Sequence, residues 1–330
     1  RTAGPGGPVA GQADALGPEA LAVLTLLSRH LFSDWVSALE EETGLPCEYD
    51  ERGAMSVVFD EAGEMALDRA LDAQRSRGLH FEVLDAEEAR GREPSLAAAL
   101  HAVFAFPRDG IARAGRVAKA LVLAARAAGV RVREGTDVEA VATAGGRVTG
   151  LRTSAGLLPA EAVVLAARKG PRGVAGAPRL RLERSCRPWL RLDAAADPDR
   201  PTRLLWTAGA WLLPRRDGTV VALGGPLGGA EPGRPSARVV SDLLAAVGKV
   251  VPASRDWGVA GSGTAREWHA PDGLPVLGEA GEDGLHVACG WGGEELVLAP
   301  AAAAVAADLV TGRVPPLAVT PFSPARLAAP

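Results

Sequence analysis

The stretch Pro271-Asp272-Gly273-Leu274-Pro275-Val276-Leu277-Gly278 decides the fold class, together with the apolar run Leu285-His286-Val287-Ala288-Cys289-Gly290 that follows it. The second run has the length of a strand and leads into a glycine turn. Beyond it, residues 298–311 are rich in alanine and are followed by Gly312, which is typical of a helix with a glycine after its C-terminus. The segment therefore predicts a turn, a buried strand and a closing helix, in that order.

A second apolar run of the same kind, Ala162-Val163-Val164-Leu165-Ala166, lies far earlier in the chain. Continuous apolar runs are typical of parallel strands that are covered on both faces, so this run predicts a central parallel strand. Because both runs lead into turns that contain glycine, we expect Val163–Ala167 and Leu285–Cys289 to lie in one parallel sheet.

A β-hairpin is predicted where the turn Arg215-Arg216-Asp217-Gly218 separates the apolar runs Ala210–Pro214 and Thr219–Gly224. Residues 1–17 show little periodicity and are expected to form a loop. Further helices are expected at 18–44, at 61–78, opening at 85–89, from 117 to the glycine at 129, and at 235–250; further strands are expected at 55–59, 130–132, 138–142, 147–153 and 187–192.

The composition describes a globular chain of about two domains: 330 residues, of which 47% are hydrophobic, with a formal net charge of −4. This slightly negative net charge gives no excess of basic residues that would attract nucleic acid. No apolar stretch reaches the ~18 residues of a membrane span. Three widely spaced cysteines fit a reducing compartment, from which we expect a cytoplasmic location. The five histidines lack metal-ligand spacing, so no metal site is expected, and the oligomeric state is left open.

Seven segments, spread along nearly the whole chain, occur in the order that is typical of a known protein family. They are Gly7–Gln12, Leu39–Gly44, Phe106–Gly110, Gly129–Val138, Val163–Ala167, Pro271–Gly278 and Phe322–Leu327. Their order and spacing resemble the FAD-dependent amino-acid oxidases of the D-amino-acid oxidase type, in the glycine oxidase branch. The sequence lacks the Gly-x-Gly-x-x-Gly turn that holds the FAD pyrophosphate at the start of such chains, so we expect residues 1–330 alone to carry no flavin.

The resemblance implies an α/β fold in which a Rossmann-like FAD-binding domain, incomplete at its N-terminus, is interleaved with an antiparallel-sheet substrate domain. The expected FAD-binding domain comprises residues 1–44, 106–175 and 276–330, and the expected substrate domain comprises residues 45–105 and 176–275.

The implied cofactor is FAD, and the implied partner is a small amino acid or amine whose C–N bond is oxidised. The residues that the resemblance places at the cofactor are small loop residues, strand ends and the entry to the last helix. They are Thr2, Gly4, Gly7, Val138, Ala166, Ala167, Gly290, Gly293, Glu294, Glu295 and Leu296.

Two residues are the candidates for substrate contact. Trp211 occupies the position of a family aromatic that lines the substrate pocket. Where the family has an arginine that pairs with the substrate carboxylate, this chain has Glu267, with Arg266 beside it. Neighbouring residues of a strand face opposite sides, so Arg266 takes this role only through a bulge or a changed register.

Three departures from the family pattern leave competing hypotheses open. Arg168 replaces a glycine after the buried strand, Glu267 replaces the carboxylate-binding arginine, and Glu294–Glu295 places two carboxylates at the entry to the last helix. The first hypothesis is a FAD-dependent oxidase that has lost its front end. The second is a non-catalytic homologue that keeps the fold as a binding module, and the third is an enzyme whose first strand lies on a separate chain.

Overall fold

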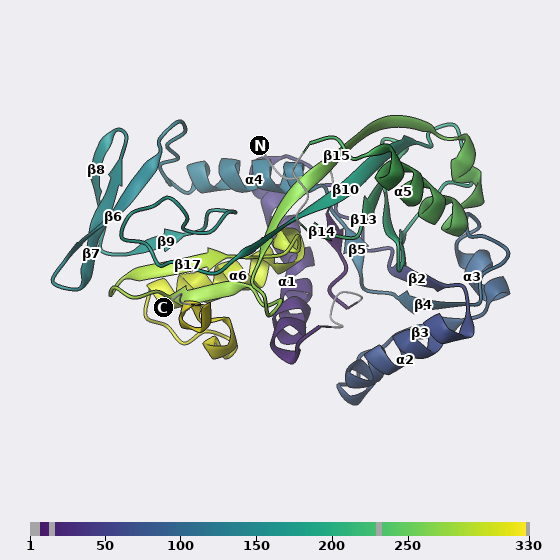
Figure 1. Cartoon of the computed structure of the whole chain (residues 1–330), viewed down its shortest axis with the longest axis horizontal. Coiled ribbons are helices and arrows are strands. Elements are labelled where there is room, and N and C mark those ends of the chain that lie inside the picture. Colours follow the sequence, from purple (N-terminus) through teal and green to yellow (C-terminus); the bar gives the residue numbers. More distant parts are fainter. Residues whose placement is uncertain (1–6, 13–16, 229–232, 328–330) are drawn as a thin grey trace. The chain divides into compact units, whose positions relative to one another are not determined.

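The computed structural model describes residues 7–12, 17–228 and 233–327 (Figure 1). The chain divides into two compact units, each assembled from segments that are distant in sequence. Unit 1 comprises residues 1–16, 36–120 and 186–266, and unit 2 comprises residues 17–35, 121–185 and 267–330.

Unit 1 is built on a large mixed sheet. In the part of the chain that the structure describes, this sheet has nine strands in the order β14-β10-β13-β12-β11-β2-β4-β3, with β15 paired to β10. Their bounds are β2 Ala54–Val58, β3 Glu82–Leu84, β4 Ala102–Phe106, β10 Glu183–Asp193, β11 Leu204–Thr207, β12 Ala210–Pro214, β13 Thr219–Gly224, β14 Leu227–Gly228 and β15 Gly258–His269.

The predicted hairpin is confirmed, because β12 and β13 pair in antiparallel register with Leu212 opposite Ala222. Its turn is held by the Asp217 carboxylate, which accepts hydrogen bonds from the Thr219 N–H at 3.1 Å and the Thr219 hydroxyl at 2.7 Å. Gly218 has φ 83°, a left-handed conformation that favours glycine. Local turn chemistry therefore favours this hairpin.

The helices of unit 1 follow the periodicity of the sequence. They are α2 Glu61–Ser76, α3 Ala86–Arg92, α5 Ala237–Val250 and the first half of α4 Ala114–Ala127, with the short 3-10 helix η1 Pro252–Asp256 after α5. Asp85 caps α3 by accepting hydrogen bonds from the N–H groups of Glu87 and Glu88, at 2.8 and 2.9 Å. The loop expected at 1–17 is wrong at β1 Pro8–Val9, which pairs with β5 Gly110–Ile111.

Unit 2 contains the predicted parallel pair. β17 Leu285–Cys289 runs parallel to β9 Val163–Leu165, with Leu285 opposite Val163, and β16 Val276–Glu279 pairs with β17 from the other side. The expectation of a central strand is wrong, because β9 is the end strand of this sheet among the described residues. Val164 is accordingly 40% exposed, while Val163 and Leu165 face the core.

A second sheet of unit 2 consists of β6 Val138–Ala144, β7 Arg147–Thr153 and β8 Gly156–Pro159. The strand expected at 130–132 is wrong. The Val130 N–H instead donates to the Ala125 carbonyl at 2.9 Å, which closes the end of α4 around Gly129. β-branched composition predicts a strand only where a partner strand is available, and here the helix end uses the backbone.

The two long helices α1 Glu19–Thr43 and α6 Glu295–Val310 meet within unit 2. α6 contains Pro300, and the Ala301 N–H donates to the Ser28 hydroxyl of α1 at 3.1 Å. A serine of α1 thus satisfies a backbone donor next to the proline, where the helical hydrogen-bond ladder is disturbed.

The C-terminal segment clasps the turn that precedes β16. It forms η2 Thr320–Phe322 and η3 Pro324–Leu327. Arg326 of η3 donates to both Asp272 carboxylate oxygens, at 2.7 and 3.3 Å, and to the carbonyl oxygens of Leu274 and Pro275, at 2.7 and 3.1 Å. One planar guanidinium therefore holds a carboxylate and two successive carbonyls.

Replacing Arg326 by alanine is expected to destabilise the protein by about 2 kcal/mol, because it leaves the half-buried carbonyls without their donor. The ion-pair part is small, since Asp272 is partly exposed. Arg313→Ala, which removes an exposed pair with Asp308, is the matched control and should change stability by less than ~0.5 kcal/mol. Denaturant melts measure both. Equal effects of the two variants would show that the clasp adds nothing.

The same pair predicts an acid dependence. Burial alone would raise the pKa of Asp272, but hydrogen bonds from Arg326 and from the Leu274 N–H outweigh it and hold the pKa below its usual value. Because the pKa of Asp272 is lower in the folded than in the unfolded protein, its ionised carboxylate stabilises the fold at pH values above the unfolded pKa of ~3.9. This stabilisation is lost as the pH falls through the pKa of the folded protein. The stability difference between the natural chain and Asp272→Asn should therefore shrink from about pH 5 downwards. A constant difference would exclude this titration.

Candidate functional site

A glycine-rich turn joins β17 to α6 in unit 2. Gly290, Gly292 and Gly293 have φ values of 73°, 65° and 96°, which glycine adopts without strain. Glu294 is the N-cap of α6 and Glu295 its first residue. After Trp291, the turn thus brings two residues without side chains, Gly292 and Gly293, to a helix N-terminus, where N–H groups favour negative charge.

The carboxylate of Glu267 lies against this turn. Glu267 is only 4% exposed, and a Cβ atom placed on Gly293 would lie 2.7 Å from its Cδ and 3.1 Å from its Oε2. A helix N-terminus stabilises such a carboxylate through its N–H groups and dipole. The family resemblance placed Glu267 at the position of a substrate-binding arginine, and only the structure reveals that its side chain packs on the start of α6.

The predicted residues Ala166 and Ala167 lie at the same sheet edge as Gly290. They follow β9, and β9 and β17 run parallel, so both strands end side by side. Ala166 and Ala167 are exposed, and the turn after them is closed by the Gly170 N–H, which donates to the Ala167 carbonyl at 2.8 Å. Two small exposed residues therefore follow β9, beside the buried Gly290 that follows β17, at the carboxyl ends of parallel strands, where ligands of open α/β sheets bind.

The other residues predicted for the cofactor are placed separately. Leu296 is half-buried in the first turn of α6, and Val138 begins β6 in the other sheet of unit 2, where it is 37% exposed. Gly7 lies in unit 1, and its carbonyl accepts a hydrogen bond from the Ala112 N–H at 3.0 Å. Thr2 and Gly4 lie outside the described residues.

In unit 1, Trp211 belongs to a row of side chains across one face of the large sheet. Register pairs Trp206 with Trp211, Trp211 with Leu223 and Leu223 with Trp189, and residues directly opposite each other share a face. Trp206 and Trp211 stack with ring centres 5.0 Å apart and an interplanar angle of 9°. Because the three tryptophans are only half-buried, this row forms an apolar wall.

The sequence gives no signal for Trp189 and Trp206, since the row depends on register between strands that are distant in the chain. Gly263 of β15 faces Trp189, because a Cβ atom there would lie 2.6 Å from its ring. Alternation along β15 directs the half-buried Arg266 to the opposite face from Gly263. Arg187 precedes Trp189 by two residues in β10, so it shares the face of the wall, and it donates to the Gly224 carbonyl at 3.3 Å.

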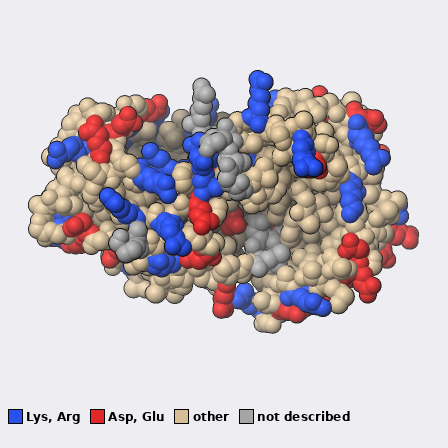
Figure 2. All heavy atoms as spheres, viewed as in Figure 1, with Lys and Arg blue, Asp and Glu red and all other residues tan. Residues whose placement is uncertain are grey.

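The thiols and charges add no further reactive centre. Burial raises the pKa of Cys289 to about 12, so it stays protonated. Within the described ranges, His, Cys, Asp and Glu side chains form no group of three that would hold a metal ion, and no helix is long and apolar enough to cross a membrane. Basic and acidic side chains are interspersed over the face in Figure 2.

A family model described as FAD dependent oxidoreductase matches residues 2–309. The chain belongs to this family. It is similar to the bifunctional protein ThiO/ThiG of Synechocystis sp., with 29% identity over 97% of this chain and 47% of that protein. It is also similar to the glycine oxidase of Geobacillus kaustophilus, with 31% identity over 92% of this chain and 81% of that protein.

The fold comparison agrees with the sequence relationships. The crystal structure of glycine oxidase from Geobacillus kaustophilus matches with a TM-score of 0.86 and 26% identity, covering 96% of this chain and 86% of that one. The match confirms the expected family and the α/β fold class. The chain spans about half the length of the bifunctional ThiO/ThiG relative.

The described sheet edge of unit 2 fits an FAD-binding role in its shape. Ala166 and Ala167 are exposed and present only a methyl group, so a planar or phosphate-bearing ligand can approach the backbone there, whereas Gly290 faces Leu182 and Gly293 faces Glu267. The buried Glu267 places a carboxylate against the same turn. The small size of the turn residues does not explain the presence of this negative charge.

The contact between Gly293 and Glu267 predicts a specific coupling. Gly293→Ala should destabilise the protein by about 2–4 kcal/mol, because the methyl group displaces a buried carboxylate and the backbone has φ 96°. Gly129→Ala, with φ 85° and nothing within 4 Å of its Cβ, should cost only about 1 kcal/mol.

A double-mutant cycle isolates the contact. In a Glu267→Ala background the cost of Gly293→Ala should fall to that of Gly129→Ala, as measured by denaturant melts. An undiminished cost in that background would mean that the backbone conformation, and not the carboxylate, sets the requirement for glycine.

Proposed function

We propose that this protein is an FAD-dependent oxidoreductase that oxidises the C–N bond of a small amino acid or amine. The observation that carries the proposal is the exposed pair Ala166 and Ala167 at the end of β9, beside the glycine turn that ends β17, in a chain matched by the FAD dependent oxidoreductase family over residues 2–309. The names of its relatives, glycine oxidase and D-amino acid dehydrogenase, support a small amino acid as the substrate class.

In this proposal the FAD is held by the turn at Gly290 and Gly293, by Ala166 and Ala167, and by the first residues of α6, which are Glu294, Glu295 and Leu296. Thr2, Gly4, Gly7 and Val138 complete the set predicted from the family pattern. FAD supplies the two-electron acceptor for the amine. The backbone and the small side chains of this chain contact the FAD. Glu267 places a buried negative charge at the N-terminus of α6.

Substrate contact is assigned to the apolar wall of unit 1. Trp211 supplies a rigid surface with its stacked neighbour Trp206, and the wall excludes water from an apolar substrate face. A substrate carboxylate requires a cation, for which Arg266 is the residue predicted from the sequence. Arg187 is the alternative that the strand geometry favours, because it shares the face of Trp189.

The test of the proposal begins with the flavin. The product of the whole reading frame should purify with FAD near one equivalent, seen by its absorbance bands. It should then reduce oxygen or an artificial acceptor when given glycine or D-alanine. Protein that binds FAD without turnover of any small amine would favour the alternative of a non-catalytic homologue. Failure to bind FAD at all would overturn the proposal.

Two arginine variants locate the carboxylate partner. The true partner, replaced by alanine, should raise the KM for glycine at least ~10-fold by removing a charge-assisted pair, and should leave the KM for an amine of similar size without a carboxylate nearly unchanged. Arg187→Ala and Arg266→Ala are compared with each substrate. If both variants affect the two substrates equally, neither arginine binds the carboxylate.

A further inference from the structure

Unit 1 contains a cavity that the proposed oxidation does not use. Its volume is about 340 Å³, which is within the range of small-molecule sites, and it opens between the segment before β2, the chain that leads into β11, and the hairpin turn after β12. Six of its lining residues are charged: Glu48, Asp50, Arg52, Arg200, Arg215 and Arg216.

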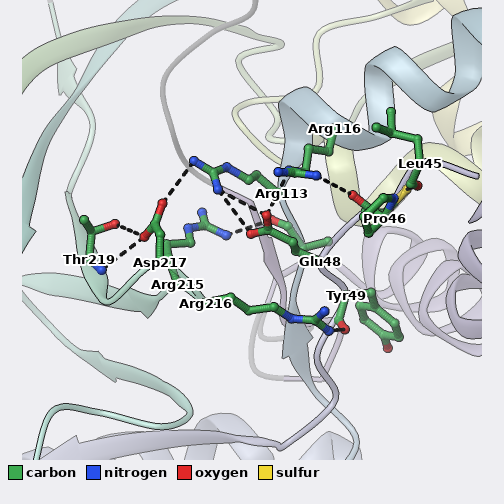
Figure 3. A network of polar contacts seen from close by, with 12 residues as sticks. Leu45, Pro46, Glu48, Tyr49, Arg113, Arg116, Arg215, Arg216, Asp217 and Thr219 are labelled. Carbon is green, nitrogen blue, oxygen red and sulfur yellow. Dashed lines mark hydrogen bonds and ion pairs between the residues drawn. The ribbon is translucent and has the colours of Figure 1, made fainter. Parts of the chain in front are cut away.

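Both carboxylates of the lining are already engaged by arginines. Glu48 lies 2.8 Å from Arg116 Nε and 3.2 Å from Arg113 Nη1, so it is clamped between two guanidiniums, as Figure 3 shows. Asp50 lies 3.2 Å from Arg52 Nε. The negative charges of the cavity wall are therefore already paired with arginines of the protein.

Three arginines of the wall donate to neutral oxygens. Arg215 donates to the Ala112 carbonyl at 3.0 Å, Arg216 to the Tyr49 carbonyl at 3.3 Å, and Arg200 to the Asp197 carbonyl at 3.2 Å. A carbonyl orients a guanidinium without cancelling its charge. Among the described lining residues, four guanidiniums thus face two carboxylates, and the cavity carries an excess of positive charge.

Burial makes this excess costly at Arg215. Its residue is 8% exposed, and desolvation, followed by repulsion from Arg113, lowers its pKa to about 10, although Glu48 and Asp217 oppose the shift. Asp217 is itself shared, because it lies 3.3 Å from Arg113 and accepts from Thr219 (Figure 3). An anion in the cavity would add to the opposing effect of Glu48 and Asp217 on Arg215.

The backbone of Glu48 is held in a conformation that fits such a site. Glu48 has φ 55°, and it is the one residue other than glycine with a positive φ in the described part of the chain. Left-handed backbone at such a residue is strained and is frequent at ligand sites. Here it accompanies a carboxylate that reaches Arg113 and Arg116 together.

We propose that this cavity binds a small dianion bearing phosphate or paired carboxylate groups, held by Arg216, Arg200 and Arg215. Guanidiniums suit both groups because their paired N–H donors match two oxygens of an oxyanion. The three arginines come from two separate segments, so the site depends on the folded state of unit 1.

Isothermal titration calorimetry tests the proposal with inorganic phosphate and with succinate. The protein is the purified full-length product with any FAD it carries, in chloride buffer at constant ionic strength. One saturable site is expected for at least one of the dianions. Arg216→Ala and Arg200→Ala should each weaken it at least ~10-fold. Arg238→Ala, an exposed arginine of α5, is the matched control and should leave binding unchanged.

The outcomes distinguish a phosphate-bearing ligand from a dicarboxylate, and a failed proposal from a misfolded variant. Binding of phosphate alone identifies a phosphate-bearing ligand, and binding of succinate alone identifies a dicarboxylate. Thermal melts establish that Arg216→Ala and Arg200→Ala are folded, which Arg215 variants would not guarantee because that side chain is buried. Absence of saturable heat, or an affinity in both arginine variants equal to that of the natural chain, overturns the proposal. Neither result bears on amine oxidation, because the readout is heat and not turnover.

Discussion

The parallel pairing of β9 with β17 is the constraint on which the rest of the structure depends. Parallel neighbours cannot be joined by a tight turn, so the chain that leaves β9 has to travel away and return before β17 begins. That excursion carries most strands of the large sheet of unit 1, which explains why both units are assembled from separate segments. The same pairing aligns the carboxyl ends of both strands and so creates the edge at Ala166, Ala167 and Gly290.

Sequence predicted the features that are encoded locally or by long apolar runs. The hairpin followed from Asp217-Gly218, and the parallel pair followed from two continuous apolar strands. What the sequence could not give is contact set by register between distant strands. The row of Trp189, Leu223, Trp211 and Trp206 is of this kind, and so is the packing of Glu267 on Gly293, since each requires that several strands already be placed.

The errors of sequence-based prediction have physical causes. The run 130–132 has strand composition, yet its first N–H closes the C-terminus of α4, so a local helix cap prevails over β-propensity. β9 has the apolar run of a central strand, but in the described part of the chain it has one neighbour, and Val164 is exposed. An apolar run thus shows that a strand can be buried on both faces. The number of strands that pair with it is decided by the fold.

The choice of arginine over lysine matters wherever one side chain binds several oxygens. Arg326 reaches a carboxylate and two carbonyls because its donors form a rigid planar fork, which a single ammonium cannot reproduce. Glu48 is clamped by two such forks, and Arg215 stays charged although buried, since a guanidinium is more weakly hydrated than an ammonium and keeps a high pKa. A lysine at position 215, once buried, would lose its proton far more readily. The cationic cavity of unit 1 is therefore a structure that arginine makes possible.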